Sequence, residues 1–277
     1  MKNSESFKIL KLDIYIDDMR QDALYSKEMT WWYDKIYVPE KVTKKQIKFL
    51  DTIFKRYKIK KVLDIACGAG RHAIPLRKLG YKIVGVDLSK DMLRIAKEKA
   101  RNEELKMPFR LMDMRNIKLK EKFDAAIIMF SSFMYNITNE DVIKTMNSVN
   151  KILKKKGILI IDFMFVWSYI VNKKLNYKFK ETMKRRNLKM LIDNKHKLDS
   201  SNLIMITKST YKRFKNKKPL KKVVIKRALR SFTPNEFDLL FRLTGFKTLN
   251  FYGNFNIKSK LSKKKFNKRL IAVGMKI

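Results

Sequence analysis

A glycine-rich turn follows the first strongly apolar segment of the chain. Residues 64–70 read DIACGAG and join a predicted strand at 62–66 to a predicted helix. Gly68 and Gly70 let the backbone approach a ligand closely, and the start of the helix offers free N–H groups to that ligand. Taken alone, the turn also fits the fingerprint that binds the pyrophosphate of a dinucleotide, with Asp87 as the acid that contacts the ribose.

Three aspartates at the ends of predicted strands separate these two interpretations. Asp64 precedes the turn, where a carboxylate would oppose a pyrophosphate but can organise the glycine loop and bind an ammonium group. Asp87 ends the second predicted strand, and Asp113 ends the third, where it can accept a hydrogen bond from an adenine amino group. This set of acids favours a cationic cofactor derived from methionine over a dinucleotide.

The elements that must position these residues alternate between strands and helices. The predicted strands of the core are 62–66, 82–87, 109–113, 123–129 and 157–165, and the predicted helices between them are 70–79, 90–101 and 139–153. Such an order forms a parallel sheet with right-handed crossovers. Two further strands, at 246–252 and 268–276, would close the sheet antiparallel. The predicted fold class is therefore α/β, with a doubly wound, mostly parallel, seven-stranded Rossmann-like sheet.

The chain divides into four predicted regions around this core. They are an N-terminal helical lid at 1–60, a cofactor-binding core at 61–166, a basic substrate-side insert at 167–231, and a C-terminal helix with closing strands at 232–277. Within the insert, apolar and polar residues alternate in three segments separated by turn sequences, namely 183–195, 202–214 and 220–232. That alternation predicts an inserted antiparallel three-stranded sheet.

Several of these segments together resemble the class I S-adenosylmethionine-dependent methyltransferases, and within them the small-molecule N-methyltransferases of the glycine and amino-sugar type. The likeness covers roughly residues 30–165 and 228–277. It rests on residues 62–100 and on the motifs Asp87-Leu88-Ser89, Met92-Leu93, Asp113-Met114-Arg115, Phe123-Asp124-Ala125, Phe130-Ser131-Ser132-Phe133, Tyr33-Asp34-Lys35-Ile36-Tyr37, and Phe232-Thr233 with Gly245-Phe246 and Tyr252-Gly253.

The resemblance implies S-adenosyl-L-methionine as the cofactor and assigns residues of this chain to each of its parts. Gly68 and Gly70 would face the methionine moiety, and Asp87 the ribose hydroxyls. The other implied contacts are Leu88 and Met92 at the adenine face, Asp113 and Met114 at the adenine edge, and Phe130 and Ser131 at the reactive end. Asp64, Ala66 and Arg71, in and beside the glycine turn, complete the predicted cofactor-binding set.

Methyl transfer from a sulfonium needs few catalytic groups, because alignment of a lone pair and exclusion of water supply most of the rate. Where some relatives of the amino-sugar type place a histidine after the fourth strand, this chain has Tyr135, which could orient or deprotonate the acceptor. Tyr33 and Tyr37 could line the methyl channel from the lid, although aromatic residues in such helices also serve as core. These three tyrosines are the predicted catalytic residues.

The basic charge is concentrated in the C-terminal part of the chain. The net charge is +40, and residues 164–277 carry 31 basic and only 5 acidic side chains. AT-rich coding or a hot habitat explains much of the lysine content, but it does not explain the near absence of acids. Self-repulsion in this region must be offset, and a polyanion or an anionic substrate would offset it.

Three functions are therefore compared. The first is a methyltransferase acting on a nitrogen or oxygen of a small molecule, which an anionic acceptor would reconcile with the charge. The alternative is a tRNA or rRNA methyltransferase that holds the phosphate backbone through residues 173–227, where 20 basic residues are interleaved with aromatic ones. Against it, no Asn/Asp-Pro-Pro-aromatic tetrad follows the fourth strand. The second alternative is a non-catalytic nucleic-acid-binding protein on the same fold.

The composition also sets expectations about compartment and metals. Cys67 is the single cysteine, so the chain forms no internal disulfide, and with only His72 and His196 as possible imidazole ligands we predict no metal site. No stretch approaches the roughly 18 consecutive apolar residues of a membrane span. We therefore expect a soluble, cytoplasmic protein without a membrane partner. The sequence carries no signal for an oligomeric state.

Overall fold

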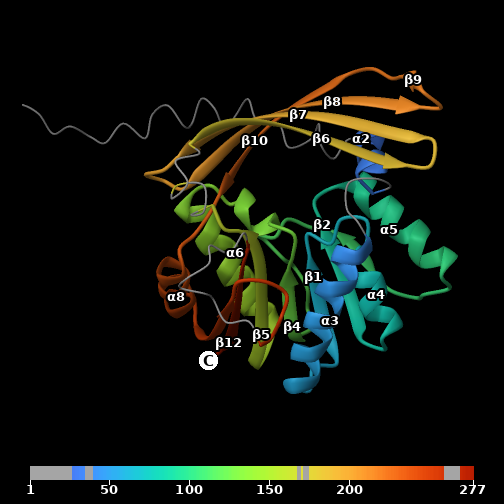
Figure 1. The fold of residues 1–277 in the computed structure, drawn as a ribbon. Helices are drawn as coiled ribbons and strands as arrows, with labels where there is room; N and C mark the ends of the chain where they lie inside the picture. The colour runs from blue at the N-terminus through green and yellow to red at the C-terminus, as the bar shows by residue number, and fades with distance from the viewer. Residues whose placement is uncertain (1–26, 35–39, 167–169, 171–174, 259–268) are drawn as a thin grey trace, which may run out of the picture.

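The computed structural model describes residues 27–34, 40–166, 170, 175–258 and 269–277. These residues form a seven-stranded core sheet and a separate antiparallel sheet that lies across one end of it (Figure 1). The strand order of the core sheet is β11-β12-β5-β4-β1-β2-β3. The strands from β5 to β3 are parallel, and β12 and β11 add to β5 antiparallel. The predicted seven-stranded, mostly parallel sheet is confirmed.

The core elements follow the predicted order with shifts at their ends. The strands are β1 (Lys61–Ile65), β2 (Lys82–Asp87), β3 (Phe109–Leu111), β4 (Phe123–Ile128), β5 (Leu153–Met164), β11 (Phe246–Tyr252) and β12 (Arg269–Lys276). The helices are α4 (Ala73–Lys78), α5 (Lys90–Asn102), α6 (Asn139–Ile152) and α8 (Pro234–Leu243), with the 3-10 helix η3 (Ser132–Tyr135). The α4 helix begins at Ala73 rather than at residue 70, because Gly70 has a left-handed φ of 76° that ends the glycine turn.

Alternating side chains of the buried strands build two apolar layers, one on each face of the core sheet. Val62 and Ile83 point to the face covered by α3 (Glu40–Arg56), α4 and α5, whereas Leu63 and Val84 point to the face covered by α6 and α8. This double coverage explains why most residues of β1, β2 and β4 are apolar, as in parallel strands buried on both faces. The sheet is therefore rigid up to the carboxyl ends of its strands.

Three helices of the core, α5, α6 and α8, begin at side-chain caps. Ser89 accepts a hydrogen bond from Met92 N at the start of α5, and Thr138 accepts one from Asp141 N at the start of α6. At α8, Thr233 and Glu236 form a complete capping box in front of Pro234. Local chemistry alone therefore defines where these helices begin.

The antiparallel sheet corrects one sequence prediction. It consists of β6 (Asn176–Arg185), β7 (Leu188–Asp199), β8 (Ile204–Lys215) and β10 (Val223–Arg230), with the short β9 (Lys218–Pro219) on β8, which makes five strands instead of the predicted three. The segment 183–195 was predicted to be one strand, but it contains the end of β6 and most of β7. Arg186 between them has a left-handed φ of 52°, so the chain reverses there in a tight turn.

The two described helices of the predicted lid occupy different places. The α3 helix packs on the core sheet, whereas α2 (Lys27–Trp32) packs against the antiparallel sheet, where Met29 and Trp32 contact the apolar side chains Leu188, Met190, Ile192, Tyr211 and Ile225. The α2 helix therefore joins the predicted lid to the antiparallel sheet, whereas α3 belongs to the core layer. Within the described part of the chain, no helix has the length and apolar character needed to cross a bilayer.

Candidate functional site

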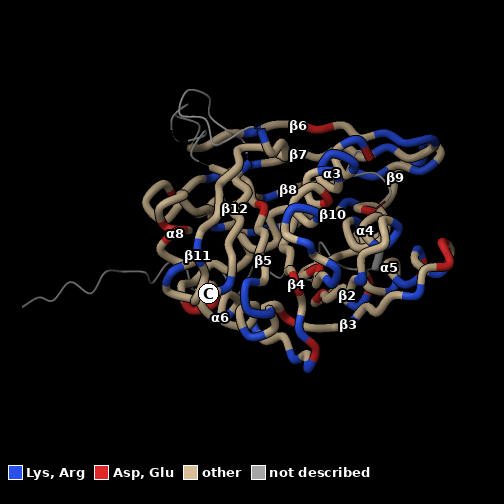
Figure 2. Tube along the Cα trace, turned by 90° about the horizontal axis from the view of Figure 1, so that it is seen from below, with Lys and Arg blue, Asp and Glu red and all other residues tan. Residues whose placement is uncertain are grey.

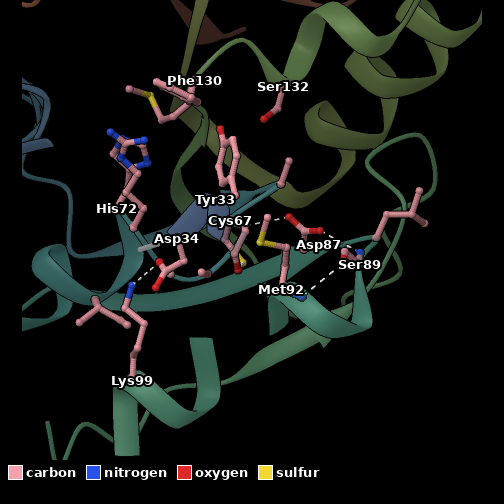
Figure 3. Close-up of a pocket in the computed structure, with 18 of the residues that line it drawn as sticks. Tyr33, Asp34, Cys67, His72, Asp87, Ser89, Met92, Lys99, Phe130 and Ser132 are labelled. Carbon is pink, nitrogen blue, oxygen red and sulfur yellow. Dashed lines mark hydrogen bonds and ion pairs between the residues drawn. The ribbon is translucent and has the colours of Figure 1, made fainter. Parts of the chain in front are cut away.

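A cavity of about 1140 Å³ lies at the carboxyl ends of β1, β2 and β4, beneath the β6–β7 end of the antiparallel sheet (Figures 1 and 3). Carboxyl ends are where open parallel sheets bind ligands, because the strand order leaves a crevice there. The predicted site residues that line this cavity are Tyr33, Ala66, Gly68, Gly70, Arg71, Asp87, Leu88, Met92, Asp113, Met114, Phe130 and Tyr135. The tertiary structure thus brings together residues from six separate segments of the chain.

The glycine turn contains three left-handed positions within five residues. Ala66, Gly68 and Gly70 have φ values of 55°, 54° and 76°. A Cβ at Gly70 would lie 2.8 Å from Ile74 Cδ1, so glycine is needed there for helix packing. A Cβ at Gly68 would meet only Met92 Sδ, at 3.8 Å, because its open side borders the cavity. Gly68 therefore keeps the backbone accessible to a ligand, and alanine at position 66 stores strain at the site.

Asp87 at the end of β2 joins the turn to the next helix. Its Oδ2 accepts a hydrogen bond from Gly68 N, and its Oδ1 accepts one from Ser89 N, both at 2.8 Å. Burial raises the pKa of Asp87, against the lowering effect of these N–H donors. Each carboxylate oxygen can accept a second hydrogen bond, so Asp87 can organise the turn and still bind two hydroxyl groups in the cavity.

The side of the cavity near β3 combines apolar surface with a paired acid. Leu88 is 58% exposed next to the buried Met92, and Met114 lies in the same wall. Arg115 binds Asp113 through Nε and Nη2, at 3.0 and 2.6 Å, and also reaches Asp141 at 3.1 Å. Although burial acts the other way, the hydrogen bonds from Arg115 lower the pKa of Asp113. Such a wall suits a planar apolar group with a polar edge.

Asp64 lies behind the glycine turn and outside the lining of the cavity. It is fully buried in β1, and neither carboxylate oxygen makes a close hydrogen bond with a described residue. Burial and the negative charge of Asp87 raise the pKa of Asp64 to about 8, opposed only by the Ala73 backbone N–H. Asp64 is absent from the residues that line the cavity, so its predicted roles, organising the turn and binding a ligand's ammonium group, stay predictions.

The loop after β4 is held in a strained conformation. Phe130 and Ser131 have left-handed φ values of 56° and 69°. Asp162 of β5 holds both, because its Oδ2 accepts from Phe130 N at 3.0 Å and its backbone oxygen accepts from Ser131 N at 2.9 Å. Arg269 of β12 binds Asp162 through two hydrogen bonds of 2.6 and 2.7 Å. This conformation places the Phe130 ring in the cavity wall. The Cζ atom of Arg71 lies over the ring, 4.4 Å from its centroid.

Ser131 was predicted to lie at the reactive end of the cofactor, and the structure turns it away. Its Oγ accepts hydrogen bonds from Arg269 Nη2 at 3.0 Å and from Met164 N at 3.1 Å, so the side chain ties the loop to β5 and β12. Ser132 lines the cavity instead. Because the backbone turns left-handed at Ser131, Ser132 and not Ser131 points to the cavity. The sequence pattern of the strand that ends at residue 129 does not reveal this turn.

Asp162 and Arg269 are the residues that sequence analysis missed. Asp162 interrupts the otherwise apolar segment 157–165, and a lone acid in a buried strand is a signal of a polar partner elsewhere in the fold. That partner is 107 residues away in the chain. The pair supports the site from outside the cavity, because it holds the backbone of Phe130 in place.

Replacing Arg269 with methionine should lower the free energy of unfolding by about 2 kcal/mol, because Asp162 is completely buried and would lose its charged partner. The 27% exposure of Arg269 keeps the loss below that of a fully buried pair. Urea denaturation measures the change. Arg242→Met is the matched control, since Arg242 pairs with Asp238 on the surface of α8 and should cost less than about 0.5 kcal/mol. Equal losses in both variants would contradict this interpretation.

The segment after α2 closes the cavity on a further side. Tyr33 packs against Ala69, Met92 and Ile95, and Asp34 accepts a hydrogen bond from Lys99 Nζ at 2.8 Å (Figure 3). This ion pair fastens the N-terminal segment to α5. Tyr37 lies outside the described residues.

Two other groups near the turn are unsuited to acid–base chemistry. His72 is buried and hydrogen-bonded to Gln46 Oε1 at 2.9 Å, and burial together with Arg71 lowers its pKa to about 3. Burial and the charge of Asp64 raise the pKa of Cys67, which keeps it a neutral thiol. Both residues act in packing around the glycine turn.

Part of the chain matches a known domain family. Residues 62–157 match a family described as the methyltransferase domain. The glycine/sarcosine N-methyltransferase of Aphanothece halophytica is 36% identical over 116 residues, which are 41% of this chain and 43% of that protein. The dTDP-3-amino-3,4,6-trideoxy-alpha-D-glucopyranose N,N-dimethyltransferase of Streptomyces venezuelae is 33% identical over 101 residues, which are 36% of this chain and 41% of that protein. The chain thus spans less than half the length of these curated relatives.

The likeness to solved structures extends over most of the chain. An S-adenosylmethionine-dependent methyltransferase from Clostridium acetobutylicum superimposes with a TM-score of 0.76 at 20% identity, covering 90% of this chain and 97% of that one. At this identity the agreement concerns the fold, including the antiparallel sheet that the domain match leaves out. Residues 62–157 are therefore a methyltransferase domain, on the fold of the class I S-adenosylmethionine-dependent methyltransferases.

Proposed function

We propose that this chain is an S-adenosylmethionine-dependent methyltransferase that methylates a nitrogen or oxygen of a small molecule, which can be anionic. The observation that carries the proposal is the cavity itself, because the glycine turn, Asp87, Tyr33 and Tyr135 all line one space. The relatives named as glycine/sarcosine and amino-sugar N-methyltransferases support an acceptor of this size.

The donor groups of the cavity fit the cofactor's charges. Arg71 donates to Thr43 Oγ1 through Nε at 2.9 Å, but its two terminal nitrogens are buried and have no hydrogen-bond partner among the described residues. Burial lowers the pKa of Arg71 to about 10, so it stays charged at neutral pH. We assign these nitrogens to the methionine carboxylate, Asp87 to the ribose hydroxyls, and Asp113 to the adenine edge.

The roof of the cavity supports an anionic acceptor. Lys184 and Arg185, at the end of β6, are lining residues that come from the insert and not from the methyltransferase domain. The opposite part of the insert is anchored on the core, where Leu198 and Met205 join the main apolar cluster. Near the hairpin, Leu188 and Met190 pack with Met29 and Trp32 of α2. These contacts support a fixed position of the basic hairpin at the cavity.

Methyl transfer from a sulfonium requires this chain mainly to align the acceptor and to exclude water. When bound, the cofactor supplies an electrophilic methyl group on a sulfonium sulfur. Tyr33 covers the cavity from the N-terminal side, and the ring of Phe130 forms the wall beside Arg71. Tyr135, at the end of η3, is a phenol in the lining that can orient an acceptor nitrogen or oxygen by donating a hydrogen bond to it or by accepting one from its N–H or O–H group.

Calorimetric titration with S-adenosylmethionine and S-adenosylhomocysteine tests the proposal, after nucleic acid has been removed at high salt. Micromolar binding of both is expected, followed by transfer of labelled methyl to at least one compound in a panel of amino acids, nucleotide-linked amino sugars and phenols. Absence of cofactor binding would overturn the proposed enzyme class. Transfer to RNA and to no small molecule would overturn the proposed acceptor.

Tyr135→Phe should lower kcat at least tenfold and leave the dissociation constant for S-adenosylmethionine unchanged, because the phenol acts on the acceptor. The measurement is steady-state kinetics with the acceptor found in the panel, together with titration of the cofactor. Tyr57→Phe is the matched control, since Tyr57 lies exposed after α3 and away from the cavity lining. A change in cofactor affinity alone would place Tyr135 in the cofactor site instead.

A further inference from the structure

The outer face of the antiparallel sheet carries a row of lysines. Side chains alternate across the sheet, so the buried Met190 and Ile192 of β7 point toward α2, whereas Lys195 on the same strand is exposed on the outside. Lys178 of β6, Lys208 of β8 and Lys226 of β10 are exposed at positions that the register aligns with Lys195. The antiparallel sheet lies over the core domain (Figure 1), and Lys and Arg positions are frequent along its strands (Figure 2), so the alternation turns the face that bears Lys195 away from α2.

The strand register places four of these lysines directly opposite one another. Lys178 of β6 pairs with Lys195, Lys195 pairs with Lys208 of β8, and Lys208 pairs with Lys226 of β10. Neighbouring strands lie about 4.8 Å apart, and like charges at directly opposed positions destabilise a sheet. Among the described residues, no carboxylate forms an ion pair with Lys178, Lys195 or Lys208. The charges of Lys178, Lys195 and Lys208 are therefore left for a partner to neutralise.

A shallow groove of about 380 Å³ borders the row. Its lining residues are Asp193, Lys195, Lys208, Thr210, Lys212, Lys222 and Val224. The single apolar member, Val224, is 44% exposed, and no aromatic side chain lines the groove. A surface that inserts into a bilayer needs bulky apolar side chains, whereas a phosphodiester chain needs spaced cations and hydroxyl donors. The groove therefore fits a nucleic-acid strand better than a membrane.

The aromatic residues that are interleaved with these lysines in the sequence lie on the other face. Tyr177 and Phe179 stack with His196 at ring distances of 4.5 and 5.0 Å, and Tyr211 is buried against α2. Bases bound at the lysine row therefore have no stacking platform formed by these rings. Recognition there would be through phosphates and would not depend on base sequence.

We infer that the outer face, formed by Lys178, Lys195, Lys208, Lys226 and the adjoining groove, binds the phosphate backbone of a single nucleic-acid strand. The surface is separate from the cavity, so the bound strand is a docking partner and not the methyl acceptor. The inference does not rest on the proposed enzymatic function.

Fluorescence anisotropy of labelled oligo(U) and oligo(dT) of about 20 nucleotides tests the inference, with salt varied from about 50 to 300 mM. The variant K178Q/K195Q/K208Q removes three members of the row. The control K82Q/K118Q/K120Q removes the same charge from exposed lysines. These lysines lie at or just before the amino ends of β2 and β4, whereas the cavity lies at the carboxyl ends of the strands. Circular dichroism melting verifies that both variants are folded.

We expect wild type to bind both oligonucleotides alike, and the row variant to bind at least tenfold more weakly at the lowest salt. Its slope of log affinity against log salt should be shallower by about 2, since each contact to a single strand contributes about 0.7. The control should stay within about twofold of wild type. Equal weakening by both triple variants, no salt-dependent binding by wild type, or binding to phosphatidylserine vesicles in place of oligonucleotides would each overturn the inference.

Discussion

Replacing Asp87 with asparagine should weaken binding of S-adenosylmethionine at least 100-fold. In the structure both carboxylate oxygens are occupied by N–H donors of Gly68 and Ser89, which leaves one further acceptor position on each oxygen for the ribose hydroxyls. In asparagine an NH₂ donor replaces one of the two oxygens, and it would face the N–H group of Gly68 or Ser89. The glycine turn is then disturbed, and one ribose hydroxyl loses its acceptor. Losing a buried charged acceptor and leaving its donors unpaired costs about 3 kcal/mol, which corresponds to a factor of more than 100.

Calorimetric titration of the folded variant measures this loss. Asp91→Asn is the matched control, because Asp91 lines the same cavity and its removal changes the net charge by the same amount. We expect the control to bind within about threefold of wild type, since a partly exposed carboxylate at the rim acts only through screened charge. Equal losses in both variants would assign the effect to general electrostatics and not to Asp87.

Replacing Asp64 with asparagine should stabilise the ligand-free protein at neutral and alkaline pH by several kcal/mol. The pKa of Asp64 rises from 3.8 to about 8 on folding, chiefly through burial. Between these values the folded protein keeps a proton that the unfolded chain releases, so the free energy of unfolding falls by about 1.4 kcal/mol per pH unit as the pH rises. Asparagine does not titrate, and the variant escapes this loss.

Urea denaturation at about pH 5, 7 and 9 gives the measurement, and the gain of the variant over wild type should grow across this series and level off above pH 8. Asp124→Asn provides a control of opposite sign. Despite some burial, Lys154 and the N–H groups of Lys60 and Lys61 lower the pKa of Asp124, so its loss should destabilise the protein once the pH exceeds 4. Parallel curves for wild type and Asp64→Asn would show that Asp64 is ionised in the folded state.

Asp87 and Asp64 lie beside the same glycine turn but are expected to differ in their effects on ligand binding and stability. Asp87 is the residue we propose for contact with the ribose, and its carboxylate is stabilised by N–H donors, whereas the burial of Asp64 is expected to cost stability near neutral pH. A residue that destabilises the free protein beside a left-handed glycine turn is the pattern expected where function limits stability. The comparison of both variants with and without cofactor would separate the two roles.

Much of this architecture was already determined by local sequence. The alternation of apolar strands and amphipathic helices predicted the seven-stranded sheet, because burial on both faces requires continuous apolar strands. Gly68 and Gly70 marked the turn, since few other residues adopt its φ values. Thr233, Pro234 and Glu236 marked the start of α8, because a helix cap is satisfied by its own neighbours in the chain.

Other features were decided only by tertiary structure. Ser132 takes the cavity position predicted for Ser131 because Asp162 and Arg269, distant in the chain, hold the intervening backbone in a left-handed turn. The lysine row depends on register between strands, which no single strand contains. Local patterns determine which face of a helix or strand is buried, because that is a property of neighbouring residues. Which charged groups meet depends on segments that the fold alone brings together, and this is where the site and the basic surface were decided.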